Sequence, residues 1–312
     1  MRRNERLLSL RSRELVAKLL TTTATRFVNE FEIKEDFVLF RSMQVVSLTL
    51  VSWIPLMGYA YAQDITLGSR TNAVDQIQIS KVDHSSWNEL LNKYVDSDGM
   101  VNYTAWKANA EDTRMLDQYL LRLSKVNPRG TQEDMLAFWI NAYNAVTIKG
   151  ILREYPTSSI RNHTARFVGY NIWKNLKLTV ANKQYSLDDI EHQVLRKMGE
   201  PRIHFAIVCA SIGCPRLLNE AYVPDRLDHQ LTKNAKSFFA DQTKFQFDAK
   251  RQRFHISPIL KWFAEDFGSS QSAQLKAIST YLPDAAAMEM ASMGKGSVSY
   301  LEYDWGLNDQ KK

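Results

Sequence analysis

The sequence predicts an α+β fold, because helical patterns and β-hairpin patterns occur in separate runs along the chain. The longest helical pattern covers residues 132–154, whereas apolar and polar residues alternate on either side of turn residues over 176–185 and 245–256. A doubly wound parallel sheet would require strands and helices in regular alternation. We therefore expect a single domain over residues 84–308, with a small, mainly antiparallel sheet packed by several helices.

Composition and charge are those of an ordinary globular protein. Of the 312 residues, 45% are hydrophobic and 24% are charged, and the net charge is +6. Residues 1–43 contain nine Lys or Arg and six Asp or Glu, so this polar leader carries half of the excess. No Lys or Arg cluster follows it, and we expect no nucleic acid partner.

An apolar run at residues 45–57 is followed by Ala60-Tyr61-Ala62, whose small residues fit a signal-peptide cleavage site. The run is shorter than the roughly 20 apolar residues of a membrane-spanning helix. We expect residues 44–62 to be a signal peptide, so that the protein is exported to the periplasm or secreted. In the alternative, residues 44–62 stay as a membrane anchor, and only this segment contacts the membrane.

The segments on either side of the signal peptide are polar. Either synthesis starts at Met43 and the leader 1–43 is not translated, or the leader is a cytoplasmic extension. Residues 63–83 have no apolar period and are expected to form a linker, with regular structure beginning near His84.

The first half of the domain is expected to be helical. Apolar residues recur at helical spacing over 87–94, and further helices are predicted at 103–110 and 115–123. A capping box of Thr131 and Asp134 begins the long helix 132–154, which ends before Tyr155-Pro156.

Asn141 and Asn144 lie three positions apart on this helix, and so on one face of it, among apolar and aromatic residues. Buried amides of this kind usually hydrogen-bond the backbone of adjoining loops. In the alternative, they orient a substrate or a catalytic imidazole.

The run 185–217 contains both cysteines of the chain. Ser186 and Asp189 predict a capped helix that ends near Gly199. Residues 203–209 then predict a strand buried on both faces, with His204 and Cys209 on opposite faces. Further elements are expected in the order helix 227–240, hairpin 245–256, helices 259–267, 272–282 and 285–293, and strand 297–302.

Several motifs of the chain resemble one family. They are SLDDIEH followed by LR, then RIHFAIVCASIGCP, AFWINAYNAVTIKGIL, ISPILKWFAEDF and YLEYDWGLN, and they span roughly residues 84–308. This set is similar to the family named domain of unknown function 547, an exported bacterial domain that also occurs in plants after a leucine-zipper segment. The resemblance implies the type of domain and its export but names no reaction.

Cys209 and Cys214 have three explanations. In an exported protein, two nearby cysteines can form a disulfide. In the second explanation, Cys209 is a nucleophile, His192 or His204 is its base, and Asn141 or Asn144 orients that base. Because His204 and Cys209 are predicted to lie on opposite faces of the strand, His192 is favoured as the base. In the third, a zinc ion is bound by the four side chains Cys209, Cys214, His192 and His204, although the C-x4-C spacing is not diagnostic.

Three further residues are candidate ligand-binding residues, namely Glu191, Arg196 and Cys214. In the alternative interpretation, Glu191 and Arg196 form a purely structural ion pair with each other. Five aromatic residues toward the C-terminus are expected in the core, namely Trp262, Phe263, Phe267, Tyr303 and Trp305. We expect no cofactor and no bound metal, since the sequence has no dinucleotide or phosphate-binding glycine motif.

Two functions follow from these residues. The first is a thiol-dependent hydrolase or acyl transferase with Cys209 as nucleophile. The second is a non-catalytic module that binds a small molecule or a protein, with a Cys209–Cys214 disulfide holding the loop.

Overall fold

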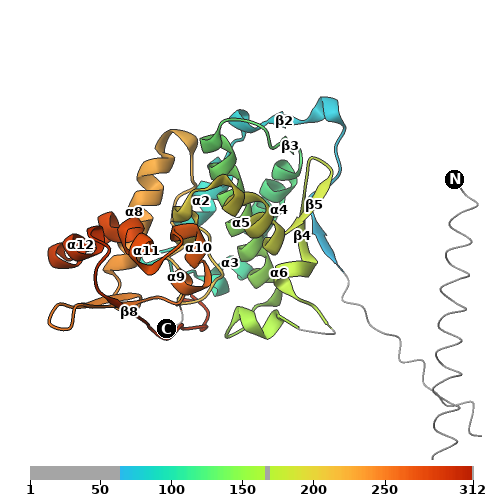
Figure 1. The fold of residues 1–312 in the computed structure, drawn as a ribbon. Helices are drawn as coiled ribbons and strands as arrows, with labels where there is room; N and C mark the ends of the chain where they lie inside the picture. Colours follow the sequence, from blue (N-terminus) through green and yellow to red (C-terminus); the bar gives the residue numbers. More distant parts are fainter. Residues whose placement is uncertain (1–63, 166–168, 311–312) are drawn as a thin grey trace, which may run out of the picture. The chain divides into compact units, whose positions relative to one another are not determined.

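Helix α5 (Gln132–Glu154) lies at the centre of the domain in the computed structural model, which describes residues 64–165 and 169–310 (Figure 1). The predicted capping box is confirmed, since the Thr131 side chain accepts from the Asp134 backbone and Asp134 accepts from the Thr131 backbone. Every residue from Leu136 to Ile148 is buried, as expected of a helix with neighbours on all sides.

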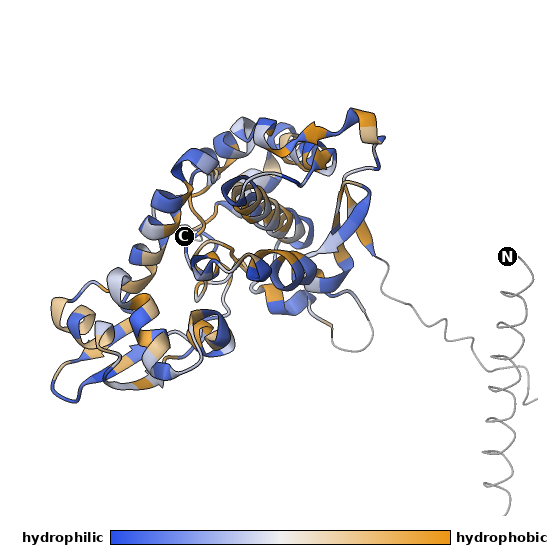
Figure 2. Cartoon of the chain, turned by 45° about the horizontal axis from the view of Figure 1, so that its top comes forward, coloured by the Kyte–Doolittle hydropathy of each residue, from blue (hydrophilic) through white to orange (hydrophobic). Residues whose placement is uncertain are grey.

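The other α-helices of the described residues are α2 (Ser85–Tyr94), α3 (Tyr103–Ala108), α4 (Ala110–Ser124), α6 (Ile172–Asn175), α7 (Leu187–Asp189), α8 (Leu227–Ala240), α9 (Ile259–Trp262), α10 (Ala264–Phe267), α11 (Gln271–Ile278) and α12 (Ala285–Ser292). Helices α3, α4 and α7 are among the elements that pack against α5, and the remaining α-helices include those of a second hydrophobic cluster. Apolar and polar residues occur within the same helices, as expected where one face is buried (Figure 2). The predicted helices 87–94, 132–154 and 227–240 are confirmed.

Short 3-10 and π-helical turns connect these elements. They are η1 (Ala73–Asp75), η2 (Ile79–Lys81), η3 (Ile160–His163), the π-helical η4 (Ile190–Leu195), η5 (Arg196–Met198), η6 (Pro201–Phe205), η7 (Pro224–Arg226) and η8 (Ser279–Tyr281). The predicted helix after Ser186 is therefore present as α7, η4 and η5 in succession. It ends at Gly199, whose φ of +70° is the left-handed conformation that glycine adopts without strain.

The α+β class is confirmed, but the strands form three small sheets, two of them mixed and one a parallel pair. The first has the order β1-β4-β5 and the second β2-β3, while β6-β7-β8 form the third. The strands are β1 (Ile65–Leu67), β2 (Ile77–Gln78), β3 (Val126–Asn127), β4 (Leu176–Val180), β5 (Lys183–Ser186), β6 (Phe245–Asp248), β7 (Arg253–Ile256) and β8 (Ser297–Tyr300). Both predicted hairpins, β4–β5 and β6–β7, are antiparallel, whereas β1 and β8 join them in parallel. The expectation of one mainly antiparallel sheet is wrong in this respect.

The predicted strand 203–209 is also wrong. Pro201 begins the 3-10 helix η6, and the backbone N–H groups of Ala206 and Ile207 both donate to the carbonyl oxygen of Ile203. A short apolar run does not distinguish a buried strand from a buried helical turn by its period. The parity argument that placed His204 and Cys209 on opposite faces therefore does not hold.

Regular structure begins earlier than His84. Strand β1 pairs in parallel with β4, and β2 pairs in parallel with β3. The described part of the segment 63–83, expected to be a linker, thus contributes strands to two sheets. The leader 1–43 and the predicted signal peptide 44–62 lie outside the described residues. Within the described part of the chain, no helix has the length and apolar character needed to span a membrane.

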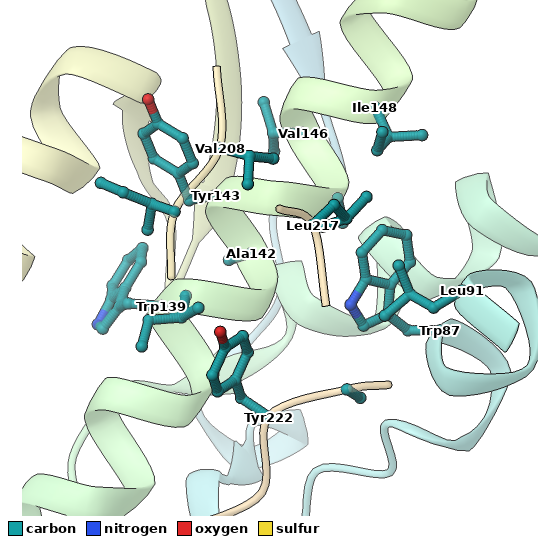
Figure 3. Packing of buried hydrophobic residues seen from close by; sticks show 14 of the residues in the cluster. Trp87, Leu91, Trp139, Ala142, Tyr143, Val146, Ile148, Val208, Leu217 and Tyr222 are labelled. Carbon is teal, nitrogen blue, oxygen red and sulfur yellow. The ribbon is translucent and has the colours of Figure 1, made fainter. Parts of the chain in front are cut away.

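Buried apolar side chains form two clusters. The larger surrounds α5, and Figure 3 shows part of it, including Val146 and Val208. The smaller joins α8, the hairpin β6–β7 and the helices α9 to α12. Ile203 and Ala206 belong to the larger cluster and Phe205 to the smaller, so the segment containing His204 connects the two.

Candidate functional site

A pocket of about 150 Å³ lies where the two clusters meet. Its lining comes from α5, α6, η4, the Cys209 loop, α9 and the C-terminal tail. The lining residues are Tyr143, Trp173, Glu191, His204, Ile207, Cys209, Cys214, Pro215, Ile259, Trp262, Phe263, Tyr303 and Trp305. A wider depression of about 930 Å³ near Ser69 and Lys125 is lined by polar residues and contains none of the predicted site residues. The smaller pocket is therefore the candidate site.

The two cysteines form a disulfide at the wall of this pocket. Their Cα atoms are 6.3 Å apart, and the Cys209 backbone N–H donates to the sulfur of Cys214 over 2.9 Å. Ala210, next in the chain, is buried and has a φ of +58°, a conformation that a residue with a Cβ seldom adopts. Such strain persists only where the surroundings impose it, which is common at functional sites.

The C-terminal tail holds the disulfide loop in place. Backbone N–H groups of Ile212 and Gly213 donate to the carbonyl oxygens of Gly306 and Asp304, both over 2.8 Å. A Cβ atom at Gly213 would lie only 2.9 Å from the backbone N and O of Asp304, so only glycine allows this close approach. Two segments far apart in the sequence therefore form one wall.

Tyr303 places its hydroxyl group against the disulfide. The Tyr303 hydroxyl is 2.9 Å from the Ser211 Oγ atom, 3.1 Å from the Cys209 Sγ atom and 3.2 Å from the Cys214 Sγ atom. Burial raises the pKa of this phenol well above its usual value. The hydroxyl is therefore a neutral hydrogen-bonding group at the base of the loop.

Asn141 and Asn144 hold loop backbone, as the structural interpretation predicts. The Asn141 amide donates to the Tyr222 carbonyl over 2.8 Å and accepts from the Tyr222 N–H over 3.0 Å. The Asn144 amide donates to Ala206 and accepts from Val208, both over 3.0 Å. Asn144 thereby positions the segment that leads into Cys209, and neither amide is among the pocket-lining groups.

His204 lies in the pocket wall and is held by a carboxylate. The Nε2 atom of its ring is 2.6 Å from Asp266 Oδ2, and the ring stacks on Phe263 with a centroid distance of 4.1 Å. Burial lowers the pKa of His204 to about 4, although the hydrogen bond to Asp266 opposes this effect. The imidazole is therefore neutral at pH 7.

Arg196 and His192 lie behind this wall. Arg196 donates to both carboxylate oxygens of Asp266, over 2.6 and 2.9 Å, and to the Nδ1 atom of His192 over 3.1 Å. The ion pair of Arg196 is thus with Asp266, and the alternative of a structural ion pair between Glu191 and Arg196 is wrong. His192 is not among the pocket-lining residues, whereas His204 shares the pocket with Cys209.

Glu191 is the carboxylate that lines the pocket. Its Oε2 atom accepts a hydrogen bond from the Tyr143 hydroxyl over 3.3 Å. Burial raises the pKa of Glu191, against the opposing influence of His192, Tyr143 and Arg196. The pocket therefore contains one acidic group that is poorly solvated.

Aromatic side chains form most of the remaining wall. Trp262, expected in the core, is 48% exposed. Its ring stacks on Trp305 at a centroid distance of 5.8 Å and makes a tilted contact with Tyr303 at 4.9 Å. Phe263 also lines the pocket, whereas Phe267 is a core residue as predicted. The assignment to the core is thus wrong for the exposed Trp262, whereas Phe263 and Tyr303 both pack against the smaller cluster and line the pocket.

Several site residues were not predicted from the sequence. Asp266, Tyr143 and Trp173 reach the site from helices distant in sequence, where helical spacing indicates only buried positions. The sequence motifs could have indicated two of these residues, because Asp266 lies in ISPILKWFAEDF and Tyr143 lies in AFWINAYNAVTIKGIL. Those motifs converge on this pocket.

A zinc site does not fit this arrangement. Sulfurs that share one bond cannot act as thiolate ligands. Over residues 64–165 and 169–310, no group of three or more His, Cys, Asp or Glu side chains is arranged to hold a metal ion.

Comparison with known proteins gives one match. No curated protein and no solved structure matches the chain. The model of the family described as "Protein of unknown function, DUF547" matches residues 129–239, which include α5, the disulfide loop and α8. The resemblance to this family is confirmed over residues 129–239, which contain three of the motifs, whereas ISPILKWFAEDF and YLEYDWGLN lie outside the matched residues.

Proposed function

We propose that the domain is a non-catalytic module that binds a small molecule in this pocket, with the Cys209–Cys214 disulfide fixing one wall. The observation that carries the proposal is that both sulfurs are in one bond and both line the pocket. A cysteine nucleophile must be a free thiolate. The oxidised domain therefore offers a shaped cavity without a sulfur nucleophile.

The character of the pocket supports binding. Ligand sites are concave, mainly apolar and aromatic, and contain a few placed polar groups. This pocket combines its aromatic rings with Glu191, His204 and the Tyr303 hydroxyl. The disulfide and the C-terminal tail hold the wall in one conformation, which lowers the entropy cost of binding.

A second candidate function is a thiol-dependent hydrolase or acyl transferase that acts after reduction of the disulfide. It is favoured by the position of His204, which shares the pocket with Cys209 and is oriented by Asp266, as nucleophile sites require. The Cys209 sulfur would attack an acyl carbon, and His204 would pass the thiol proton to the leaving group. Water would then release the acid.

The pKa of His204 weighs against this second function. An imidazolium partner lowers the pKa of a cysteine thiol, and so increases its reactivity. Burial lowers the pKa of His204 to about 4, so this partner is uncharged at pH 7. The binding module therefore agrees better with the electrostatics of the site.

A comparison of hydrolysis rates tests the two functions. p-Nitrophenyl acetate is supplied to the reduced domain, the oxidised domain and the Cys209→Ser/Cys214→Ser variant. For a binding module, all three should hydrolyse the ester at the same slow rate. A rate in the reduced domain at least about 100-fold higher, lost in Cys209→Ser and in His204→Gln, would establish the thiol enzyme instead.

The protein is also proposed to be exported, with cleavage after Ala62. The disulfide supports this location, because such bonds persist mainly in oxidising compartments. N-terminal sequencing of the protein from its native host should find Gln63 as the first residue. An intact leader would refute cleavage, and recovery of an uncleaved form with membranes would favour the anchor formed by residues 44–62.

A further inference from the structure

Six aromatic rings surround the pocket, from Tyr143, Trp173, Trp262, Phe263, Tyr303 and Trp305. Three of them form a contiguous group, with centroid distances of 4.9 Å for Trp262 and Tyr303, 4.5 Å for Tyr303 and Trp305, and 5.8 Å for Trp262 and Trp305. The face of an aromatic ring carries negative potential and attracts cations.

The charges of the pocket lining point in the same direction. Glu191 is the one carboxylate among the described lining residues, and none of them is Lys or Arg. The nearby Arg196 is already paired through two hydrogen bonds with Asp266. Burial keeps His204 uncharged by lowering its pKa to about 4. The described lining therefore carries no positive side chain of its own, although the Arg196 and Arg161 guanidinium groups lie 5.4 and 5.2 Å from the ring centroids of Phe263 and Trp305.

Glu191 is a half-buried carboxylate with few hydrogen-bond partners. Its Oε2 atom has one long hydrogen bond, 3.3 Å, from Tyr143, and its Oε1 atom has no hydrogen-bond partner among the described residues. Partial desolvation disfavours the charged carboxylate, and a positive charge close to it would stabilise that form. A cationic ligand would supply the missing charge.

We propose that the pocket binds a small organic ammonium ion, with its nitrogen close to Glu191 and its alkyl groups against the aromatic rings. This inference rests on the proposed binding function and gives it a ligand class. The cavity of about 150 Å³ corresponds to about five water molecules, each occupying about 30 Å³. An alkylammonium group of choline size is of the same order as this volume.

Titration with two compounds of the same shape tests the ligand class. Choline and its uncharged analogue 3,3-dimethylbutan-1-ol, in which carbon replaces the ammonium nitrogen, are titrated into the oxidised domain in a calorimeter at pH 8. We expect choline to bind at least about tenfold more tightly, because only the cation interacts with Glu191 and with the ring faces. In Glu191→Gln the preference for choline should fall to about threefold or less.

A second pair of variants tests the rings. Trp262 and Tyr300 are 48% and 43% exposed, so both can be replaced at little cost to folding, but only Trp262 lines the pocket. Trp262→Ala should weaken choline binding about fivefold, whereas the control Tyr300→Ala should bind choline like the parent domain.

The outcomes separate the ligand class from the proposed function. The anion 3,3-dimethylbutanoate is titrated in the same way as a third compound. If either the alcohol or this anion binds at least as well as choline, the ammonium inference is overturned and the binding module stands. If none of the three binds, or if Glu191→Gln leaves the preference unchanged, the inference is also overturned. The proposed function itself is tested separately, by the thiol-dependent hydrolysis described above.

Discussion

The side chain of Asn144 supplies hydrogen bonds that a neighbouring strand would otherwise provide. It binds both the Ala206 carbonyl and the Val208 N–H, on either side of Ile207. This explains why a run that resembles a buried strand can remain outside any sheet. The asparagine pair was recognised in the sequence. The backbone partners of Asn144, however, lie 62 and 64 positions away and could not be located from spacing alone.

Replacing Asn144 by leucine should therefore destabilise the domain. The change leaves the Ala206 carbonyl and the Val208 N–H buried without partners, at about 1–3 kcal/mol for each group. We expect the free energy of unfolding in urea to fall by about 2–6 kcal/mol. The exposed Asn92→Leu on α2 is the control and should change it by no more than about 0.5 kcal/mol. Equal effects of the two variants would contradict this role.

Burial of neutral His204 predicts a dependence of stability on pH. Its pKa is about 4 in the folded domain and about 6.5 in the unfolded chain. Between these values the unfolded chain binds a proton that the folded domain does not, so stability falls as the pH falls from about 6.5 to 4. The free energy of unfolding should fall by about 3 kcal/mol over this pH range, since one pKa unit corresponds to about 1.36 kcal/mol.

Urea unfolding at several pH values checks this prediction by comparison with His204→Gln. Burial also lowers the pKa of His84 to about 4, but His84 is present in both proteins and its effect cancels in the difference. The parent should lose more stability than the variant between pH 6.5 and 4. If the free energy of unfolding falls equally with pH in the parent and in the variant, His204 does not titrate as its burial requires.

Elements with local signals could be predicted from the sequence, and elements without them could not. Helix α5 was predicted with its correct bounds because its capping box and the Tyr155-Pro156 stop lie within the segment itself. Strands β1 and β2 contain only three and two residues. They depend on partners more than 45 positions away, β4 and β3, and a polar sequence gives no sign of such pairing.

The loop 209–215 and the C-terminal tail stabilise each other, which makes Gly213 a critical position. A methyl group there would meet the Asp304 backbone at 2.9 Å and the Tyr303 ring at 3.0 Å. Gly213→Ala should lower the free energy of unfolding by about 1–3 kcal/mol, the usual cost of overpacking. It should also speed reduction of the disulfide by dithiothreitol, because the loop is held less firmly.

The neighbouring Ile212→Val is the matched control for this variant. Ile212 is 39% exposed, so the loss of one methyl group should change the free energy of unfolding by no more than about 0.5 kcal/mol. Chemical unfolding and a timed reduction assay give both quantities. If Gly213→Ala is as stable as the control, the close approach of loop and tail is not a constraint.

The pocket forms where the two hydrophobic clusters meet, a common position for ligand sites. The sequence supplied Cys209, Cys214, His204 and Glu191 as candidates, because unusual residue types close together in one stretch can be recognised. It could not supply Asp266 or the aromatic wall, which become neighbours only through tertiary packing. The preference for His192 over His204 depended on a strand that does not form, so the sequence argument for it no longer holds.

The chemical state of the two cysteines in the mature domain tests the binding module most directly. The domain is isolated from its native compartment without reductant and treated with iodoacetamide between pH 5 and 9. We predict no alkylation, and an intact mass about two hydrogens below that of the reduced form, because both sulfurs are in one bond. A single cysteine that alkylates well below the pH of an ordinary thiol, with a midpoint that rises in His204→Gln, would contradict the binding module and establish the thiol enzyme.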